Sequence, residues 1–340
     1  MHRTLSFVAL ILFICPGILS FAQKKAGTPL IGKIICIDPG HGGTAATDSY
    51  RVGPGGEREE WINLRVALFL RQMLEDRGAR VVMTRTTDVF VPLPDRSKIC
   101  VEAGADIFIS IHHNATADSS VNFPIIYFHG HASENRAGVL FGKLLAKEFV
   151  TTLYKGKVSE EGNFASLASD FTIFPEAGAS VLRHTYGIPA VLAEASFFSN
   201  AKEEQLLKSK AHNLEEAHAY LKALESFYSR PVPPIAEKNS VVAGIPPFRV
   251  FQEAERMSPV AKRWKQDFYD ALSLAKRTDA ASAAEALSLF TRSARSFPDS
   301  YLAGQCHRYR SELLERKGET QAAREESVRA KEYYVELPDL

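Results

Sequence analysis

Histidine and acidic side chains stand at the ends of three apolar runs in this chain. His41 follows "IICIDPG", His112 and His113 end "DIFISIHH", and Glu194 lies within "VLAEASF". Runs of this kind predict buried strands. Because an α/β sheet binds its ligands beyond the carboxyl ends of its strands, we expect these side chains to converge in one crevice.

The segment "GGEREEWINL" adds three acidic residues, Glu57, Glu59 and Glu60, at the start of a predicted helix. Two neutral imidazoles and one carboxylate can form a catalytic zinc site that keeps its fourth position open for water. Zinc lowers the pKa of that water towards about 7, and a carboxylate outside the ligand set can accept its proton. The same carboxylate can then protonate a leaving amine. The residues therefore favour zinc-dependent hydrolysis.

Each of these residues also has an ordinary structural explanation. A histidine at a strand end is more often a hydrogen-bonded structural residue than a metal ligand. The three glutamates would stabilise a helix N-terminus through the helix dipole. Glu194 is harder to explain in this way, because it follows a run that should be buried and an unpaired buried carboxylate is costly. The combination of residues, and no single one, favours a metal site.

Strands and helices alternate from residue 31 to about residue 228. The strand-like runs are "KIICID", "ARVVMTR", "DIFISIHHN", "FPIIYF" and "IPAVLAEASF". Helices are predicted over "EWINLRVALFLRQMLEDRG", over "RSKICVEAG" with Asp95 as its N-cap, over "GVLFGKLLAKEFVTTL", and over residues 202–227. This alternation predicts an α/β fold with a mostly parallel sheet and helices on both faces.

Residues 1–22 are predicted to be a secretory signal peptide. His2 and Arg3 precede the apolar run "LSFVALILFICPGIL", and small residues at Ser20 and Ala22 suit cleavage. A Pro-Gly pair interrupts the run, which is also short for a membrane span. We therefore expect export to the periplasm or the cell exterior, with no stable membrane insertion after cleavage.

The composition changes after residue 228. The segment 229–247 contains five prolines, which predict either a linker or a wrapped strap, stiffened by proline. From residue 248 to residue 340 the chain is predicted to be a small all-α region. Some of its small residues are spaced as in a tetratricopeptide-like helical hairpin, and a generic helical bundle explains them equally well. These residues are Ala286, Ser293, Pro298, Gly318, Ala323 and Ala330.

Charge and cysteine content narrow the possible partners and the redox chemistry. The net charge is +1 over 340 residues, so no global field favours nucleic acid or an anionic membrane. Without the leader, the cysteines are Cys36, Cys100 and Cys306, and none forms a C-x-x-C pair. We expect Cys36 and Cys100 to pack as small apolar residues. A disulfide between them is the alternative in an oxidising compartment.

Five motifs occur in an order that gives the chain a family resemblance. They are "IDPGHGG", "EEWINL", "TRTTDVFVPLPDR", "ADIFISIHHNA" and "IPAVLAEASFFSN". Over roughly residues 31–225 the sequence resembles the zinc-dependent N-acetylmuramoyl-L-alanine amidases of the amidase-3 type. The resemblance implies a mixed, mainly parallel sheet flanked by helices, with residues 31–228 as the catalytic domain. It also implies cleavage of the amide between N-acetylmuramic acid and the L-alanine of the stem peptide in peptidoglycan.

The resemblance implies roles for individual residues as well. His41 matches the first zinc ligand, and His112 matches the histidine ligand of the third strand, which leaves His113 as a bystander. Glu59 matches the acidic ligand because it lies four residues before the asparagine of "EEWINL". Glu194 matches the catalytic acid/base. The implied cofactor is thus Zn²⁺, and the implied substrate is peptidoglycan.

Some features leave the family pattern or extend it. Asp38 is expected to support His41 as a hydrogen-bonding partner. Glu60-Trp61 replaces the usual basic and polar pair, so Glu60 would become the ligand if the helix began later. Ser196 stands where the family has glycine, and a positive φ there would cost about 1 kcal/mol. Residues 154–180 are expected to form either a regulatory segment or a substrate-binding rim or lid.

Two other functions stay open on the sequence. In the first, the amidase-like region is a non-catalytic platform that binds the cell wall, and the C-terminal helices recruit a protein partner. In the second, the same zinc fold is a peptidase that acts on short peptides. The presence of all four matched residues favours the amidase over the binding platform.

Overall fold

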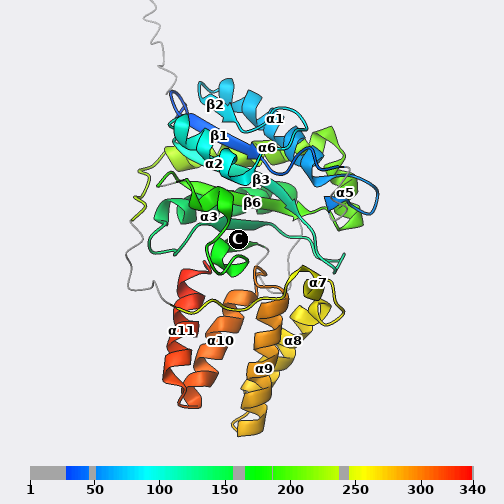
Figure 1. Cartoon of the computed structure of the whole chain (residues 1–340), viewed down its shortest axis with the longest axis vertical. Coiled ribbons are helices and arrows are strands. Elements are labelled where there is room, and N and C mark those ends of the chain that lie inside the picture. Colours follow the sequence, from blue (N-terminus) through cyan, green and yellow to red (C-terminus); the bar gives the residue numbers. More distant parts are fainter. Residues whose placement is uncertain (1–27, 46–50, 156–164, 186, 237–244, 339–340) are drawn as a thin grey trace, which may run out of the picture.

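A six-stranded sheet forms the centre of the protein (Figure 1). The computed structural model describes residues 28–45, 51–155, 165–185, 187–236 and 245–338, so the predicted signal peptide lies outside the described part. The strands are β1 (Ile34–Pro39), β2 (Arg80–Met83), β3 (Ile107–Asn114), β4 (Ile125–Phe128), β5 (Ser166–Ser169) and β6 (Ala190–Phe197).

The strand order is β2-β1-β3-β6-β4-β5. All neighbouring strands are parallel except β4 and β6, which are antiparallel. The mixed, mainly parallel sheet is therefore confirmed. The sequence did not predict β5, because its "SLAS" stretch has one large apolar residue and no alternating pattern.

Helices cover the sheet and form the C-terminal region, as predicted. They are α1 (Glu59–Glu75), α2 (Leu93–Glu102), α3 (Arg136–Leu153), η2 (Asp170–Thr172), α4 (Ser180–Arg183), α5 (Ala201–Leu207), α6 (Lys210–Tyr228), α7 (Glu253–Arg256), η3 (Ala261–Arg263), α8 (Trp264–Ala275), α9 (Ala280–Ser296), α10 (Ala303–Arg316) and α11 (Thr320–Glu332).

Two helix predictions were wrong in detail. Helix α2 begins at Leu93, so Asp95 lies in its first turn and is not the N-cap. The expected helix over 202–227 is two helices, α5 and α6. The break is stabilised by the side chains of Arg65 and Asn213, which donate to the Leu207 carbonyl at 2.9 and 3.0 Å and so satisfy the end of α5.

Each face of the sheet has its own hydrophobic core. On one face α1, α3 and α6 pack against the strands, with fully buried rings such as Phe141 and Phe227 in contact at 5.4 Å. Burial of each such ring contributes about 1.5–3 kcal/mol. The other face contains Phe108 together with Cys36 and Cys100. Both cysteines are free and buried, so they pack as expected and form no disulfide.

The C-terminal helices complete the core on this second face. The ring of Phe297, which follows α9, lies 4.9 Å from Trp264, 5.8 Å from Phe123 and 6.2 Å from Phe197. Tyr301 meets Phe123 edge-on at 5.0 Å. Phe123 precedes β4 and Phe197 is the last residue of β6. The helical region therefore contacts the sheet near the beginning of β4 and the C-terminal end of β6.

The proline-rich segment and the chain end are also attached to the protein. Ala236 donates its backbone N–H to Glu134 at 2.8 Å, and Arg329 donates to the Pro246 carbonyl at 2.6 Å. Val335 donates its backbone N–H to Leu167 in β5 at 2.9 Å. The backbone after α11 therefore covers the outer edge of β5, which would otherwise present unpaired hydrogen-bonding groups.

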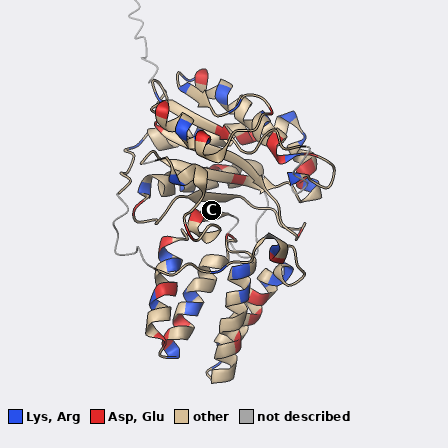
Figure 2. Cartoon of the chain, viewed as in Figure 1, with Lys and Arg blue, Asp and Glu red and all other residues tan. Residues whose placement is uncertain are grey.

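Helices α8–α11 stand side by side as two antiparallel hairpins (Figure 1). Among the small residues noted in the sequence, Ala286, Ser293 and Ala323 are buried between these helices. Their relation to tetratricopeptide repeats stays a prediction. Acidic and basic residues are interspersed over both parts of the protein (Figure 2). Within the described ranges, no helix combines the length and apolar character that a membrane span requires.

The shared core predicts that the two parts unfold together. Substitution Phe297→Ala should lower the free energy of unfolding by about 3–5 kcal/mol, as expected for a phenylalanine removed from a packed core. Denaturant unfolding followed by circular dichroism and tryptophan fluorescence should show one shared transition. Tyr269→Ala, on an exposed part of α8, is the matched control and should have little effect. Separate transitions for the two parts would contradict the shared core.

Candidate metal centre

The turn after β1 holds His41 in a conformation that few residues adopt. His41 has φ 57°, and it is the one non-glycine residue with positive φ in the described part of the chain. Such a backbone costs of order 1–3 kcal/mol and persists only where its surroundings enforce it. The preceding Gly40 is also required, because a Cβ there would lie 2.2 Å from the His112 imidazole. The turn therefore permits close approach of the two histidines.

Two buried arginines hold this turn by its backbone carbonyls. Arg96 donates to Pro39 at 2.9 Å and to His41 at 2.6 Å. Arg85 donates to Pro39 and to Gly40, both at 2.8 Å. The sequence analysis did not identify either arginine as part of the site. A signal for them was present, since both lie in the motif "TRTTDVFVPLPDR".

Asp38 supports the turn in a different way from the one expected. Its carboxylate accepts from Arg96 at 2.7 Å, from Ser110 at 2.7 Å and from Thr84 at 2.5 Å, and its contact with His41 is indirect, through Arg96. Burial alone would raise the pKa of Asp38, but Arg96 and the two hydroxyls lower that pKa below its ordinary value. The carboxylate is therefore ionised and fixes Arg96.

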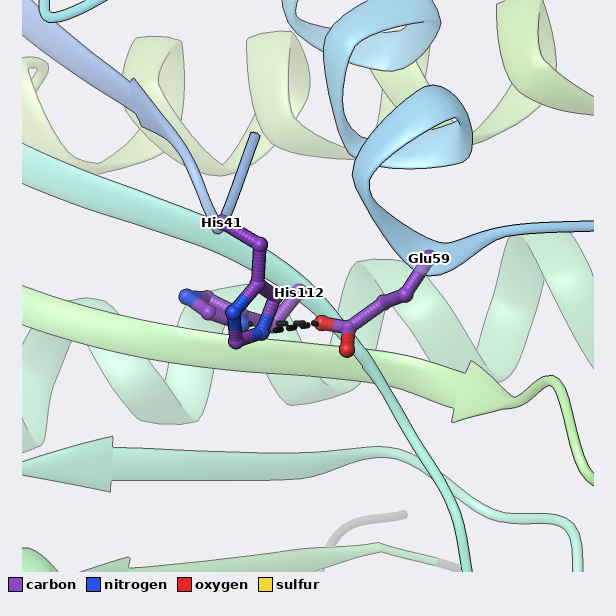
Figure 3. Close-up of side chains that lie close together, drawn as sticks. All are labelled: His41, Glu59 and His112. Carbon is purple, nitrogen blue, oxygen red and sulfur yellow. Dashed lines mark hydrogen bonds and ion pairs between the residues drawn. The ribbon is translucent and has the colours of Figure 1, made fainter. Parts of the chain in front are cut away.

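His41, Glu59 and His112 converge from three different elements (Figure 3). His41 follows β1, Glu59 is the first residue of α1, and His112 lies near the end of β3. Oε1 of Glu59 lies 3.1 Å from Nε2 of His41 and 2.9 Å from Nδ1 of His112. One donor atom from each residue can be chosen so that all three lie within 4.8 Å of one another.

The electrostatics of this cluster suit a cation. Burial would raise the pKa of Glu59, yet the imidazoles of His41 and His112 hold it well below its ordinary value. Burial lowers the pKa of His112 to about 4. The cluster thus offers an ionised carboxylate and a neutral imidazole, the protonation states in which these groups bind zinc.

The neighbouring glutamates lie outside the cluster. Glu60 is buried and pairs with Nε of Arg58 at 2.7 Å. Glu57 pairs with Arg65 at 2.8 Å. Helix α1 starts at Glu59, so the later helix start that would have favoured Glu60 does not occur.

His113 turns away from the cluster and supports it from behind. Its Nδ1 lies 2.8 Å from the Asn63 side chain and its Nε2 lies 3.0 Å from Glu216 on α6. Asn63 in turn donates to Oε1 of Glu59 at 3.2 Å. This buried chain connects α6 to Glu59 and restrains the position of the carboxylate.

Glu194 lies beside the cluster on the adjacent strand. It is the register partner of His112 in the β3–β6 pairing. Its Oε2 is buried and has no hydrogen-bond partner among the described residues. Burial and the carboxylates of Glu59 and Asp299 raise its pKa well above the ordinary value, while Arg51 opposes this shift. A shift in this direction brings a carboxyl group closer to the behaviour of a general acid and base.

Two further sequence expectations have a structural outcome. Ser196 lies within β6 and does not have positive φ, so the expected backbone strain is absent. Residues 156–164 of the expected regulatory or rim segment lie outside the described residues. The residues that follow form β5 and η2. Strand β5 is an edge strand and is separated from β1 by β3, β6 and β4.

The buried Asp38–Arg96 pair predicts an acid-sensitive stability. Because the folded pKa of Asp38 is depressed, the stabilisation is complete above its unfolded value of about 3.9 and is lost as pH falls below it. Asp38→Asn should lower the free energy of unfolding at pH 7 by about 3–5 kcal/mol, because Arg96 loses its buried partner. The loss should shrink towards pH 3 in denaturant titrations.

The control is Glu102→Gln, which removes an exposed carboxylate from the end of the same helix that carries Arg96. It should leave both the stability and its pH dependence nearly unchanged. An equal loss for Asp38→Asn at pH 3 and pH 7 would show that ionisation of Asp38 contributes nothing.

Several known proteins are similar in sequence to this chain. The chain is 31% identical over 207 residues to the probable cell wall amidase LytH of Staphylococcus epidermidis, a match that covers 61% of this chain and 62% of that protein. It is 28% identical over 236 residues to N-acetylmuramoyl-L-alanine amidase AmiA of Escherichia coli, covering 61% of this chain and 78% of that protein. The chain thus spans less than two thirds of the length of LytH.

Among solved structures, the catalytic domain of CwlV, an N-acetylmuramoyl-L-alanine amidase from Bacillus (Paenibacillus) polymyxa var. colistinus, is 28% identical and superposes with a TM-score of 0.47. The match covers 59% of this chain and 99% of that one. A family model described as N-acetylmuramoyl-L-alanine amidase matches residues 35–226, which include all five sequence motifs. The protein therefore belongs to the amidase-3 family.

Proposed function

We propose that this protein is a zinc-dependent amidase that cleaves the bond between N-acetylmuramic acid and the L-alanine of the stem peptide in peptidoglycan. The observation that carries the proposal is the cluster of His41, Glu59 and His112 with Glu194 on the next strand. Membership of the amidase-3 family supports the same reaction.

The donor set fits zinc, with His41, Glu59 and His112 as the residues that would hold it. Two imidazoles and one carboxylate, close enough to share one ion, form the ligand set of many catalytic zinc sites. When bound, zinc supplies Lewis-acid chemistry, which polarises a carbonyl and makes water a better nucleophile at neutral pH. The Asn63–His113–Glu216 chain keeps Glu59 in place for this role.

Glu194 is proposed as the general base and then the general acid. A water molecule adds to the amide carbonyl carbon, and Glu194 accepts the proton that this water loses. The C–N bond then breaks, and Glu194 gives the proton to the departing alanine nitrogen. The raised pKa of Glu194 suits both transfers, because a carboxyl group with a pKa nearer neutrality can take and release a proton at the working pH.

We also infer that the protein acts outside the cytoplasm, because its proposed substrate is the cell wall and LytH, a relative, is described as a probable cell wall amidase. The sequence at residues 1–22 agrees with export. Recruitment of a protein partner by the C-terminal helices has no comparable support. The aromatic rings of Phe297 and Tyr301 in this region pack against Phe123 beside the sheet instead.

Metal removal should abolish the reaction. Treatment with a chelator should stop release of stem peptides from purified sacculi, and added zinc should restore it, as measured by mass spectrometry of the products. Glu59→Gln should lose bound zinc in elemental analysis of the folded protein, whereas Glu60→Gln should keep it. Zinc loss in Glu60→Gln alone would assign the ligand to Glu60.

Glu194→Gln should keep the metal and lose about 10²–10⁴-fold in turnover, since only the proton transfer is removed.

Activity should be measured on two substrates, purified sacculi and the free stem peptide. An amidase cleaves only the former, and a peptidase would cleave the latter. If Glu194→Gln turned over substrate as fast as the wild type, the proposed mechanism would be excluded. If the wild-type protein bound sacculi but released no product, the non-catalytic binding platform would be favoured.

A further inference from the structure

Four large apolar side chains are exposed together near the His41 turn. Val89 and Phe90 lie in the loop after β2, Leu93 begins α2, and Trp61 lies in the first turn of α1. They are 48, 64, 55 and 39% exposed, respectively. Exposed apolar patches mark ligand-binding grooves and other interaction sites. We call these four residues the apolar shelf.

The backbone of Val89 and Phe90 packs closely against the turn that carries His41. A Cβ added to Gly42 would lie 2.4 Å from the Val89 carbonyl oxygen, and one added to Gly43 would lie 2.5 Å from the Phe90 nitrogen. These two glycines immediately follow His41. The loop that carries Val89 and Phe90 therefore lies next to the turn that positions His41.

Hydrogen bonds hold the shelf in place. Asp88 accepts from the indole Nε1 of Trp61 at 3.0 Å and from the backbone N–H of Gly43 at 2.7 Å. The indole is thus fixed by its polar edge to the same turn that carries His41. An aromatic ring fixed before binding loses little conformational freedom when a ligand stacks on it.

We propose that the apolar shelf is a subsite for the glycan strand of peptidoglycan, in which Trp61 and Phe90 stack on the apolar faces of sugar rings. This inference rests on the proposed function, which supplies the substrate. A pyranose ring presents C–H groups on its faces and hydroxyl groups at its edge, so it complements an aromatic ring that has a carboxylate beside it.

The glycan is a better match for the shelf than the stem peptide. On the peptide side, the scissile bond is followed by alanine, whose single methyl group would cover little of two aromatic rings. On the other side, the lactyl group joins directly to a sugar of the glycan strand.

The test compares two substrates that differ in their glycan. One is a peptidoglycan chain of several disaccharides, and the other is a muropeptide with a single N-acetylmuramic acid. The ratio of kcat/KM for the chain to that for the single-sugar muropeptide should fall about tenfold in Trp61→Ala and in Phe90→Ala, an effect of the size measured for aromatic contacts. Trp61→Phe should retain most of the ratio. Phe174→Ala, which removes a 51% exposed ring elsewhere, should not change it.

A second measurement does not depend on catalysis. The chain has two tryptophans, and Trp264 is buried, so a peptide-free glycan strand of alternating N-acetylglucosamine and N-acetylmuramic acid should change the fluorescence of Trp61. The change should disappear in Trp61→Phe. If the wild type cleaves no substrate but binds this glycan, the amidase proposal fails while the subsite stands.

Other outcomes overturn the subsite. The subsite would be excluded if the ratio of the two kcat/KM values stayed unchanged in both Trp61→Ala and Phe90→Ala. This holds whether the two kcat/KM values fall equally or do not change at all. A loss that grows with the length of the stem peptide would assign the shelf to the peptide instead. Absence of any fluorescence change with the glycan strand, in a wild-type enzyme that cleaves sacculi, would exclude glycan stacking on Trp61.

Discussion

The buried ion pair between Asp38 and Arg96 is the interaction on which the site depends. Arg96 carries its charge into the interior and, with Asp38 as its partner, donates to the carbonyls of Pro39 and His41. These bonds hold His41 at a positive φ that it would not adopt alone. If Arg96 lost its partner, an uncompensated buried charge would remain, which typically costs about 3–5 kcal/mol. The residues of this ion pair therefore carry the free-energy cost of burying two charges and also maintain the strained backbone at His41.

The sequence predicted the mixed, mainly parallel sheet, and the side chains that it proposed as metal ligands, His41, Glu59 and His112, lie together in the structure. Apolar runs ending in His41, His112 and Glu194 predicted where the strands end, and parallel pairing brings those ends together. Family resemblance was needed to choose Glu59 among three glutamates and His112 over His113. In the structure each of the other residues has its own partner: Arg65 for Glu57, Arg58 for Glu60, and Asn63 with Glu216 for His113.

What the sequence did not reveal was long-range support. Arg85 and Arg96 act on backbone carbonyls, and such contacts leave no periodic signal in the chain. Strand β5 was missed because its side chains are mostly small, and its pairing depends on β4 and on residues after α11. The break between α5 and α6 likewise depends on Arg65 from a distant helix. In each case the decisive partner lies far away in the sequence.

The backbone that follows α11 covers the outer edge of β5, and this has a consequence for the order of assembly. A chain emerging from a ribosome or a translocation channel would have the whole sheet available well before the segment around Val335 arrives. Until then β5 would be an open template for pairing with another molecule. Folding of the sheet without aggregation thus calls for either prompt arrival of the segment around Val335 or a chaperone that shields the exposed strand in the meantime.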